Sequence, residues 1–304
     1  MKLAIVTSRD HARYHDDDRP LIDALERRGV ACAPCVWDDA AVAWDAYHAA
    51  LVRTPWDYYR RWPEFRVFLD RIEATGTPLF NPPKTLRWNA DKRYLLELAA
   101  AGVPVVETRV VARGDVRGLR DAVASLAAEE LVVKPVVSAG AWHTVRFARR
   151  AFDPDEPALA TALAHADLLV QPYLDVVARD GEWSLMFLGG RYSHAILKRP
   201  RAGDFRVQEK HGGVSEPREP GDALVAAAQR AVDALPALGH AGCLYARVDG
   251  VVREGAFVLM ELEAFEPQLF LTDRPDAGER FAEVVVAAMR AAGHRLAPMS
   301  GLLE

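Results

Sequence analysis

The sequence predicts a mixed α/β fold in which an N-terminal parallel α/β domain (residues 1–88) precedes two α+β lobes (residues 89–174 and 175–304). Over the first part of the chain, short apolar runs alternate with amphipathic stretches, the pattern of a small parallel sheet with helices on its faces. Shorter strands and helices alternate through the middle part. In the last part, two apolar runs flank Arg253-Glu254-Gly255-Ala256, which predicts an antiparallel hairpin.

Proline and glycine residues mark the elements of the N-terminal domain. Pro20 stands near the start of a helix that Gly29 ends, because proline suits the first helical turn and glycine the residue after the last. A second helix over residues 62–74 stops before Gly76. The strands between and around these helices are predicted over residues 2–7, 30–37, 49–53 and 78–80. Neither G-x-G-x-x-G after the first strand nor G-x-x-x-x-G-K-[ST] occurs, which excludes the nicotinamide fingerprint and the standard P-loop.

The same signals divide the two later lobes into elements. An amphipathic helix over residues 89–101 opens the middle lobe and ends at Gly102. The remaining elements of that lobe are strands over residues 105–111, 131–135, 144–148 and 168–172, with helices over 116–128 and 156–164. The C-terminal lobe contains strands over residues 183–188 and 191–198, a polar loop over 200–219, a helix over 222–235, the hairpin, and a helix over 278–292.

Composition narrows the class of protein. The 304 residues exceed what one core usually covers, and 50% hydrophobic with 27% charged residues is ordinary for a globular protein. A net charge of −5 gives no reason to expect nucleic acid or an anionic membrane as partner. The apolar run at residues 1–6 is too short for a signal peptide, and no apolar run reaches membrane-spanning length, so we expect neither a signal peptide nor a membrane span. With only three cysteines, Cys32 and Cys35 being interpreted as structural reduced thiols, we expect a cytoplasmic protein.

A cluster of acidic residues in the hairpin is the strongest chemical signal. Alternation along a strand puts Glu261 and Glu263 on one face, and the hairpin folds them back beside Asp249. Carboxylates that converge in this way repel one another and need a cation, for which oxygen ligands favour Mg²⁺. Arg247 shares the face of Asp249, which suggests that a negatively charged intermediate is handled there.

Several segments are candidates for binding a nucleotide, each with an alternative interpretation. Lys134 is followed by Ser138-Ala139-Gly140-Ala141, small residues that let backbone N–H groups approach a phosphate, although a lysine in an apolar strand is often an edge charge. The segment Gln171-Pro172-Tyr173-Leu174 is either a hinge that binds an adenine edge or only an interlobe connection. Glu182 opens the next strand, either to bind ribose hydroxyls or as an exposed acid at a strand end.

Two further segments carry basic residues that are candidates for binding phosphate. Lys92 lies in the first turn of its predicted helix, where it opposes the helix dipole, which favours a reason other than stability. Lys198 ends a strand and precedes residues 203–213, a charged loop with Arg206 near its middle and two glycines at its end. Such a loop is either a solvated connection or a lid that closes over phosphates.

Taken together and in this order, these segments resemble the ATP-grasp enzymes, in particular the glutathione-synthetase-like branch, over nearly the whole chain. The resemblance implies that the two later lobes clamp ATP, with Lys92, Lys134 and Lys198 on its phosphates. It also implies adenine at residues 171–174, ribose at Glu182, and a mobile loop over residues 203–213. Two Mg²⁺ ions, which Mn²⁺ can replace, would bind Asp249, Glu261 and Glu263. The family usually has asparagine in place of Glu263, so this ligand departs from the pattern.

The acceptor side is predicted at the end of the third strand. Arg53-Thr54-Pro55-Trp56-Asp57-Tyr58-Tyr59 resembles the segment that faces the substrate in glutathione-synthetase-like proteins, and ligands gather at the carboxyl ends of parallel strands. Arg53 would hold a substrate carboxylate. The alternative is that Trp56 and Tyr58 only pack between lobes.

The resemblance implies an ATP-dependent carboxylate–amine ligase that works through an acyl phosphate on small-molecule substrates. Within the branch, the stretches around residues 53–59, 81–95, 134–144 and 203–213 are similar to the bacterial ligases that close the cycloserine ring. Ligation between two molecules and cyclisation within one both stay open, as does a homo-oligomer, since the related enzymes are often dimers or tetramers. The alternatives in other classes are a non-catalytic nucleotide-binding protein and a small-molecule kinase.

Overall fold

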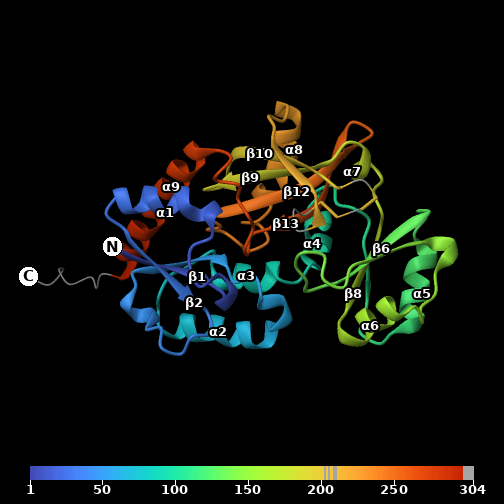
Figure 1. The fold of residues 1–304 in the computed structure, drawn as a ribbon, viewed down its shortest axis with the longest axis horizontal. Helices are drawn as coiled ribbons and strands as arrows, with labels where there is room; N and C mark the ends of the chain where they lie inside the picture. The colour runs from blue at the N-terminus through green and yellow to red at the C-terminus, as the bar shows by residue number, and fades with distance from the viewer. Residues whose placement is uncertain (202, 205, 208–210, 297–304) are drawn as a thin grey trace, which may run out of the picture.

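The computed structural model describes residues 1–201, 203–204, 206–207 and 211–296, in which we find three β-sheets (Figure 1). The first sheet is parallel with the order β2-β1-β3-β4, as the alternation of strands and helices predicts. Its strands are β1 (Lys2–Thr7), β2 (Ala31–Val36), β3 (Ala49–Thr54) and β4 (Leu79–Phe80), and its helices are α1 (Arg19–Arg27) and α2 (Trp62–Ala74).

The second sheet is antiparallel, with the order β5-β8-β6-β7. Leu119, Val123 and Leu163 of its two helices pack on Leu131 and Val170 of its strands, which gives this part of the chain a core of its own. The elements are β5 (Arg109–Val111), α5 (Val116–Ser125), β6 (Glu130–Pro135), β7 (Val145–Ala148), α6 (Pro157–His165) and β8 (Leu168–Pro172).

The third sheet is antiparallel, with the order β11-β10-β9-β12-β13. One of its helices, α8, packs Ala228, Ala231 and Val232 against strand residues such as Phe187 and Val248. The elements are α7 (Val176–Arg179), β9 (Glu182–Leu188), β10 (Arg191–Arg199), β11 (Val214–Pro217), α8 (Asp222–Asp233), β12 (Tyr245–Arg253), β13 (Ala256–Glu263) and α9 (Pro275–Leu296).

The predicted helix over residues 89–101 is wrong in its extent, because the structure has two helices, α3 (Pro83–Asn89) and α4 (Tyr94–Ala100). Between them the backbone N–H of Lys92 donates to the Val136 carbonyl at 2.8 Å instead of to a helical partner. The Asp91 side chain accepts from the Arg93 N–H at 3.0 Å, a local bond that competes with helix formation.

Three other expectations differ from the structure. The strand predicted over residues 105–111 is confined to β5, while Val105 pairs with Leu259 of β13. The loop predicted over residues 200–219 contains β11, which pairs with β10, and α7 was not predicted at all. Short 3₁₀ helices, also unpredicted, lie at Arg9–His11, Asp16–Asp18, Trp44–Ala46, Tyr58–Arg60 and Arg149–Ala151.

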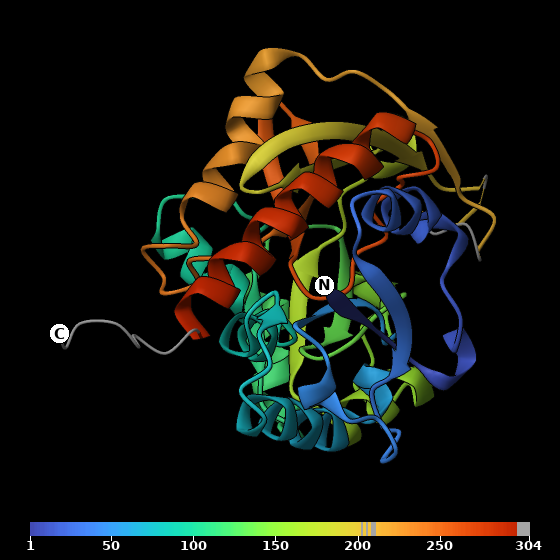
Figure 2. The same ribbon diagram turned by 90° about the vertical axis from the view of Figure 1, so that its left-hand side faces the viewer.

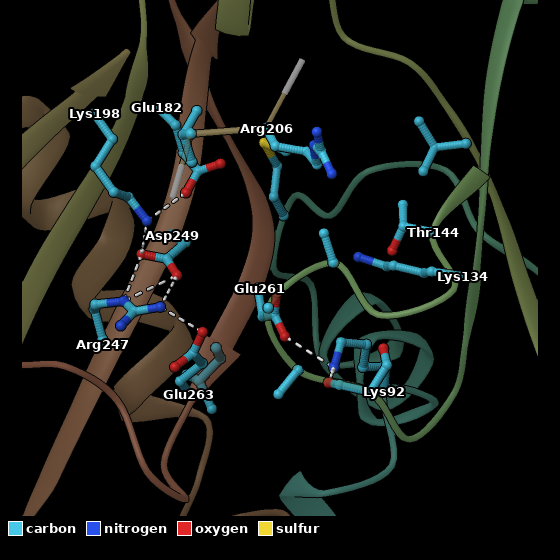
Figure 3. Close-up of a pocket in the computed structure, with 18 of the residues that line it drawn as sticks. Lys92, Lys134, Thr144, Glu182, Lys198, Arg206, Arg247, Asp249, Glu261 and Glu263 are labelled. Atoms are coloured by element: carbon cyan, nitrogen blue, oxygen red, sulfur yellow. Dashed lines mark hydrogen bonds and ion pairs between the residues drawn. The ribbon is translucent and has the colours of Figure 1, made fainter. Parts of the chain in front are cut away.

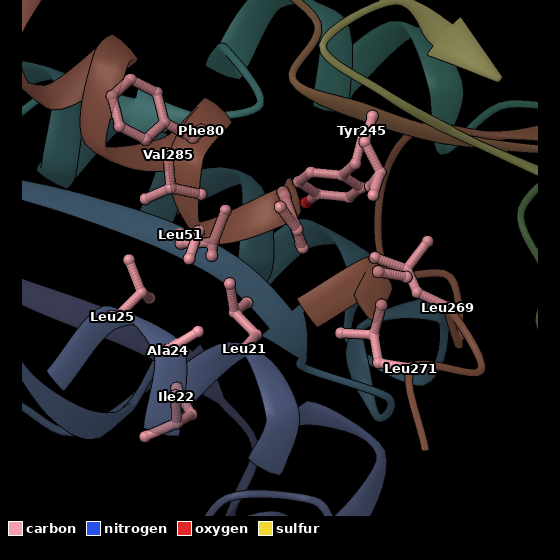
Figure 4. Packing of buried hydrophobic residues seen from close by; sticks show 14 of the residues in the cluster. Leu21, Ile22, Ala24, Leu25, Leu51, Phe80, Tyr245, Leu269, Leu271 and Val285 are labelled. Carbon is pink, nitrogen blue, oxygen red and sulfur yellow. The ribbon is translucent and has the colours of Figure 1, made fainter. Parts of the chain in front are cut away.

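The largest core cluster joins the first and third sheets through α1 and α9 (Figures 1 and 2). Leu21 and Leu25 of α1 pack with Leu51 of β3, and the same cluster contains Tyr245 of β12 and Val285 of α9 (Figure 4). Segments from both ends of the chain therefore share one interior. In the described part of the chain, no helix is long and apolar enough to cross a membrane.

Hydrogen bonds from buried polar side chains fix the end of β13. Asn89 donates to the Leu262 carbonyl at 2.7 Å and accepts from the Ala264 N–H at 2.6 Å, and the Tyr94 hydroxyl accepts from the Leu262 N–H at 2.9 Å. Asn81 donates to the Ala264 carbonyl at 2.7 Å. The strand that carries the predicted metal-binding acids thus ends in a rigid segment.

Candidate active site

A cavity of about 530 Å³ lies where the three sheets meet, and most of the predicted site residues line it (Figure 3). Figure 3 shows two groups that face each other across it. The first comes from β9, β10, β12 and β13, and the second from β6 and the segment before α4. The lining residues that the sequence predicted are Trp56, Tyr58, Lys92, Lys134, Ser138, Gly140, Gln171, Pro172, Tyr173, Leu174, Glu182, Lys198, Arg206, Arg247, Asp249, Glu261 and Glu263.

The register of the hairpin brings the acidic residues together. Asp249 stands opposite Glu261, and Arg247 stands opposite Glu263. The Arg247 Nε donates to both carboxylate oxygens of Asp249 at 3.0 Å, and its guanidinium also pairs with Glu263. Lys198 Nζ lies 3.6 Å from Asp249. Arg247 therefore links Asp249 and Glu263, and Lys198 joins the same largely buried network through Asp249.

The network holds the acids in different states of protonation. Burial opposes ionisation of Asp249, but Arg247 and Lys198 outweigh it and lower its pKa to about 2. Lys92, whose Nζ lies 3.1 Å from Glu261, similarly lowers the pKa of that acid against the effect of burial. Burial raises the pKa of Glu263 to about 8 despite Arg247. At neutral pH Asp249 and Glu261 are thus the two charged oxygen donors.

Within the described ranges, no three acidic, histidine or cysteine side chains surround a common point closely enough to hold a metal ion. Each predicted ligand is instead paired with a cation: Asp249 and Glu263 with Arg247, and Glu261 with Lys92. The donor set still fits Mg²⁺, because these are carboxylate oxygens on adjacent strand positions that line one cavity. Binding an ion would require Lys92 and Arg247 to release part of these carboxylates.

The opposite wall has the properties of an anion site. Lys134 lines the cavity and makes no ion pair with any described residue, and burial lowers the pKa of its amino group. Ser138 and Gly140 lie beside it in the cavity wall, and Lys92 donates to the Ser138 carbonyl. A half-buried amine without an ion pair, next to a loop of small residues, favours a bound anion over an empty site.

An apolar slot adjoins this anion site. Val106, Leu174, Val177 and Met260 belong to one cluster of packed residues and also line the cavity. The Gln171 side chain donates to the Thr108 hydroxyl at 2.9 Å, which fixes the segment that leaves β8. A flat apolar ring between packed aliphatic side chains is the ligand that this slot suits.

Two charged pairs lie between the slot and the acidic network. Lys198 Nζ lies 2.7 Å from Glu182. Burial raises the pKa of Glu182. Burial also acts to lower the pKa of Lys198, but the negative charges of Asp249 and Glu182 outweigh it and raise that pKa. Arg206 pairs with Asp204 at 2.8 Å, and its neighbour Val207 is buried in the apolar cluster. Of the predicted lid over residues 203–213, Phe205 and residues 208–210 lie outside the described residues.

The predicted substrate segment divides into two pairs. Trp56 and Tyr58 line the cavity, as expected. Arg53 is buried away from it, where it pairs with Asp18 at 2.7 Å and donates to the Pro267 carbonyl. Asp57 likewise turns to Trp37 and Arg61. Neither is among the residues that line the cavity, because tertiary partners hold both side chains elsewhere.

Several residues that line the cavity were missed. Glu266 and Gln268 follow the hairpin by a few residues, His15 lies in the turn before α1, and Thr144 flanks a predicted segment. Glu266 was the one that could have been found, since it is a third acid within six residues of Glu261. The others carry no local signal, because their approach to the cavity depends on how the lobes pack.

Comparison with known proteins identifies relatives of the whole chain. The chain is 34% identical over 301 residues to the cycloserine biosynthesis protein DcsG of Streptomyces lavendulae, which covers 95% of this chain and 99% of the relative. The chain belongs to the DcsG family of ATP-grasp ligases. Residues 3–81 also match the family model described as the N-terminal domain of D-cycloserine synthetase DcsG.

Solved structures agree with this membership. The crystal structure of D-cycloserine synthetase DcsG matches with a TM-score of 0.86 and 33% identity over 95% of this chain and 100% of that one. A D-alanine–D-alanine ligase from Bacillus anthracis, at 15% identity, matches with a TM-score of 0.68 over 97% and 99% of the two chains. A RimK domain protein from Sphaerobacter thermophilus matches with a TM-score of 0.66 at 21% identity, over 94% and 100%. The last two show the ATP-grasp fold alone.

Membership in the family establishes the class of reaction. The DcsG-family protein is an ATP-dependent ligase that forms carbon–nitrogen bonds and acts on small molecules. Its fold is the mixed α/β ATP-grasp fold that the sequence predicts. Two solved proteins of this fold hold a nucleotide: the D-alanine–D-alanine ligase of Bacillus anthracis is complexed with ATP, and the ligase PsnB is complexed with Mg and ADP.

Proposed function

We propose that this enzyme activates the carboxylate of a small amino acid with ATP and closes a ring by attack of an amino-oxy nitrogen of the same molecule, as in cycloserine formation. The observation that carries the proposal is the 34% identity with the cycloserine biosynthesis protein over 95% of this chain. Cycloserine contains a bond between a carboxyl carbon and a nitrogen attached to oxygen. Opening that bond gives O-amino-D-serine, which we take as the substrate to test.

The residues of the cavity suit the phosphoryl-transfer step. Lys134 and Lys92, with the loop at Ser138 and Gly140, would hold the ATP phosphates, and Lys198 would approach the transferred group. The apolar slot beside residues 171–174 would hold the adenine, and Glu182 the ribose. Attack of the substrate carboxylate on the terminal phosphate gives an acyl phosphate and ADP.

Metal binding is proposed for the acidic network. Asp249, Glu261 and Glu263 would hold two Mg²⁺ ions, for which Mn²⁺ can substitute; a bound ion would neutralise phosphate charge. The chain's contribution is to keep Asp249 and Glu261 ionised, which Arg247 and Lys92 do before any ion binds. Glutamate at position 263 supplies a carboxylate oxygen where relatives of the wider family have an amide oxygen.

Ring closure is proposed to depend on Arg247 and the loop that contains Arg206. When the amino-oxy nitrogen attacks the acyl phosphate, negative charge develops on the carbonyl oxygen, and Arg247 would stabilise it. Arg206 and Val207 lie at the cavity, where their loop would exclude water that otherwise hydrolyses the acyl phosphate. Phosphate then leaves and the amide bond forms. Free cysteines, of which Cys35 is buried, and the use of ATP fit a cytoplasmic enzyme.

The test is a product analysis with O-amino-D-serine, ATP and Mg²⁺. The proposal predicts cycloserine, ADP and inorganic phosphate in equal amounts. A stable phosphate ester in place of cycloserine would show a kinase. Absence of any nucleotide turnover, with nucleotide binding retained, would show a binding protein on the same fold.

A further inference from the structure

Among the described acidic residues that line the cavity, Glu266 is the one without a direct ion pair. It lines the cavity, yet its residue is only 7% exposed. The other acids there are all paired: Asp249 and Glu263 with Arg247, Glu261 with Lys92, and Glu182 with Lys198. Glu266 makes no ion pair with any residue that the structure describes. A buried carboxylate without a cation is costly unless a ligand supplies one.

The side chain of Glu266 is held in a fixed position. The Tyr58 hydroxyl lies near the Glu266 carboxylate and lowers its pKa as a hydrogen-bond donor would, and the Tyr58 ring is itself buried and stacked on Phe265 with a centroid distance of 4.2 Å. The backbone is fixed as well, because Trp56 Nε1 donates to the Glu266 carbonyl at 3.0 Å. One hydroxyl satisfies only part of a carboxylate, which can accept about four hydrogen bonds. The remaining acceptor capacity is preorganised for a ligand.

Glu266 lies close to the place where the substrate carboxylate is expected to react. It follows Glu263 by three residues, at the end of the strand that carries the predicted metal-binding acids. In an α-amino acid the ammonium and the carboxylate are attached to the same carbon. An anchor for the ammonium must therefore lie next to the place where the carboxylate meets the terminal phosphate. Trp56, Tyr59 and His15 complete this end of the cavity with aromatic rings, which suit a small cation.

We propose that Glu266, positioned by the Tyr58 hydroxyl, binds the α-ammonium group of the substrate and so restricts this ligase to α-amino acids. The proposal rests on the proposed function for the location of the reacting carboxylate. Burial raises the pKa of Glu266 to about 7 although the nearby charges of Lys92 and Arg247 lower it, as expected for a carboxylate that no cation contacts directly. The ammonium would donate to the carboxylate oxygen capacity that Tyr58 leaves free.

The experiment compares O-amino-D-serine with 3-(aminooxy)propanoate, which keeps the carboxyl and amino-oxy groups and lacks only the ammonium. Calorimetry measures binding of each to the enzyme with ADP and Mg²⁺. The wild-type enzyme should prefer the amino acid about a hundredfold, the loss typical when one partner of a buried charge pair is removed. Glu266→Gln should abolish this preference by weakening only the amino acid, with ADP·Mg²⁺ affinity unchanged. Tyr58→Phe should reduce it partly.

Three outcomes would overturn the proposal. The first is a wild-type enzyme that binds both acids equally, which needs no variant and so does not depend on the folding of Glu266→Gln. The second is equal weakening of both acids by Glu266→Gln. The third is loss of ADP·Mg²⁺ affinity in that variant, which would make Glu266 a metal ligand. Glu283→Gln, an exposed acid on α9, controls for the change of charge. If ring closure is wrong but Glu266 is right, no cycloserine forms while the binding preference persists.

Discussion

Lys134 differs from the other lysines of the cavity because it has no acidic partner among the described residues. Its amino group is desolvated, which lowers its pKa, so it contributes little to stability and much to an anion site. We predict that Lys134→Met raises the KM for ATP and lowers kcat/KM for ATP by roughly a hundredfold. The free energy of unfolding should not fall, since a half-buried amine without an ion pair is replaced by an apolar chain.

Lys84→Met is the matched control, because Lys84 is an exposed lysine at the start of α3. It should leave both steady-state constants for ATP unchanged. If Lys134→Met destabilised the protein strongly while sparing kcat/KM for ATP, the lysine would be a structural charge, the alternative that the sequence left open.

Glu261 is the residue whose substitution tests the proposed Mg²⁺ site. Glu261→Gln keeps the shape of the side chain and removes one of the two acids that are ionised at neutral pH. We predict that turnover falls by roughly a hundredfold or more, that the melting temperature changes little, and that the Mg²⁺ concentration for half-maximal activity rises. Activity that persists with an unchanged Mg²⁺ dependence would remove Glu261 from the metal site.

Among the elements, β10 is linked to the segment after β13 by a buried histidine. His194 Nε2 lies 2.8 Å from the Leu269 carbonyl, and burial, with Arg274 and Arg280 nearby, lowers its pKa below the usual 6.5. The folded protein therefore disfavours a proton that the unfolded chain accepts. Stability from this group is present above pH 6.5 and is lost as the pH falls through the lowered pKa.

We predict that the free energy of unfolding decreases below pH 6.5 by up to about 1.4 kcal/mol per pH unit for this one group. His194→Gln should flatten the slope in denaturant titrations at several pH values. His165→Gln, at an exposed position on α6, should leave the slope as it is. An unchanged slope in His194→Gln would mean that other groups cause the acid sensitivity.

Elements with strong local signals were predicted well, and those that depend on other segments were not. The predictions of helices α1, α2 and α5 agree with the structure, and for α1 the signals are Pro20 and Gly29. The strands of the hairpin follow from the alternation around Glu261. The break before α4 could not be foreseen, since it depends on Lys92 bonding to Val136 in another element. The residues of the site differ in the same way. Periodicity along the hairpin strands was enough to predict that its acids lie together. Arg53 was expected at the cavity but lies away from it, because it pairs with Asp18 in a tertiary contact.

For the whole molecule, the core cluster predicts which parts unfold together. We propose lobes over residues 1–88, 89–174 and 175–304, of which the first and third share a core that includes Phe281 of α9. Phe281 is fully buried and its ring lies 5.6 Å from that of Tyr245. Phe281→Ala should cost about 3–5 kcal/mol. Hydrogen exchange should speed up in β1 and β12 together, while β6 keeps its protection.

Faster exchange in β12 alone would show that the first and third sheets are stable independently. Leu131→Ala is the matched control, since Leu131 is fully buried in the separate cluster of the second sheet. It should speed up exchange in β6 and β8 and leave β1 unaffected.

The central claim, that the substrate carboxylate is activated as an acyl phosphate, is tested most directly by isotope transfer. O-amino-D-serine labelled with ¹⁸O in both carboxylate oxygens is turned over with unlabelled ATP, and the inorganic phosphate is analysed by mass spectrometry. Because phosphate leaves with the oxygen that bridged it to the carbonyl carbon, the account predicts one ¹⁸O atom in each phosphate released. Unlabelled phosphate alongside cycloserine formation would contradict it.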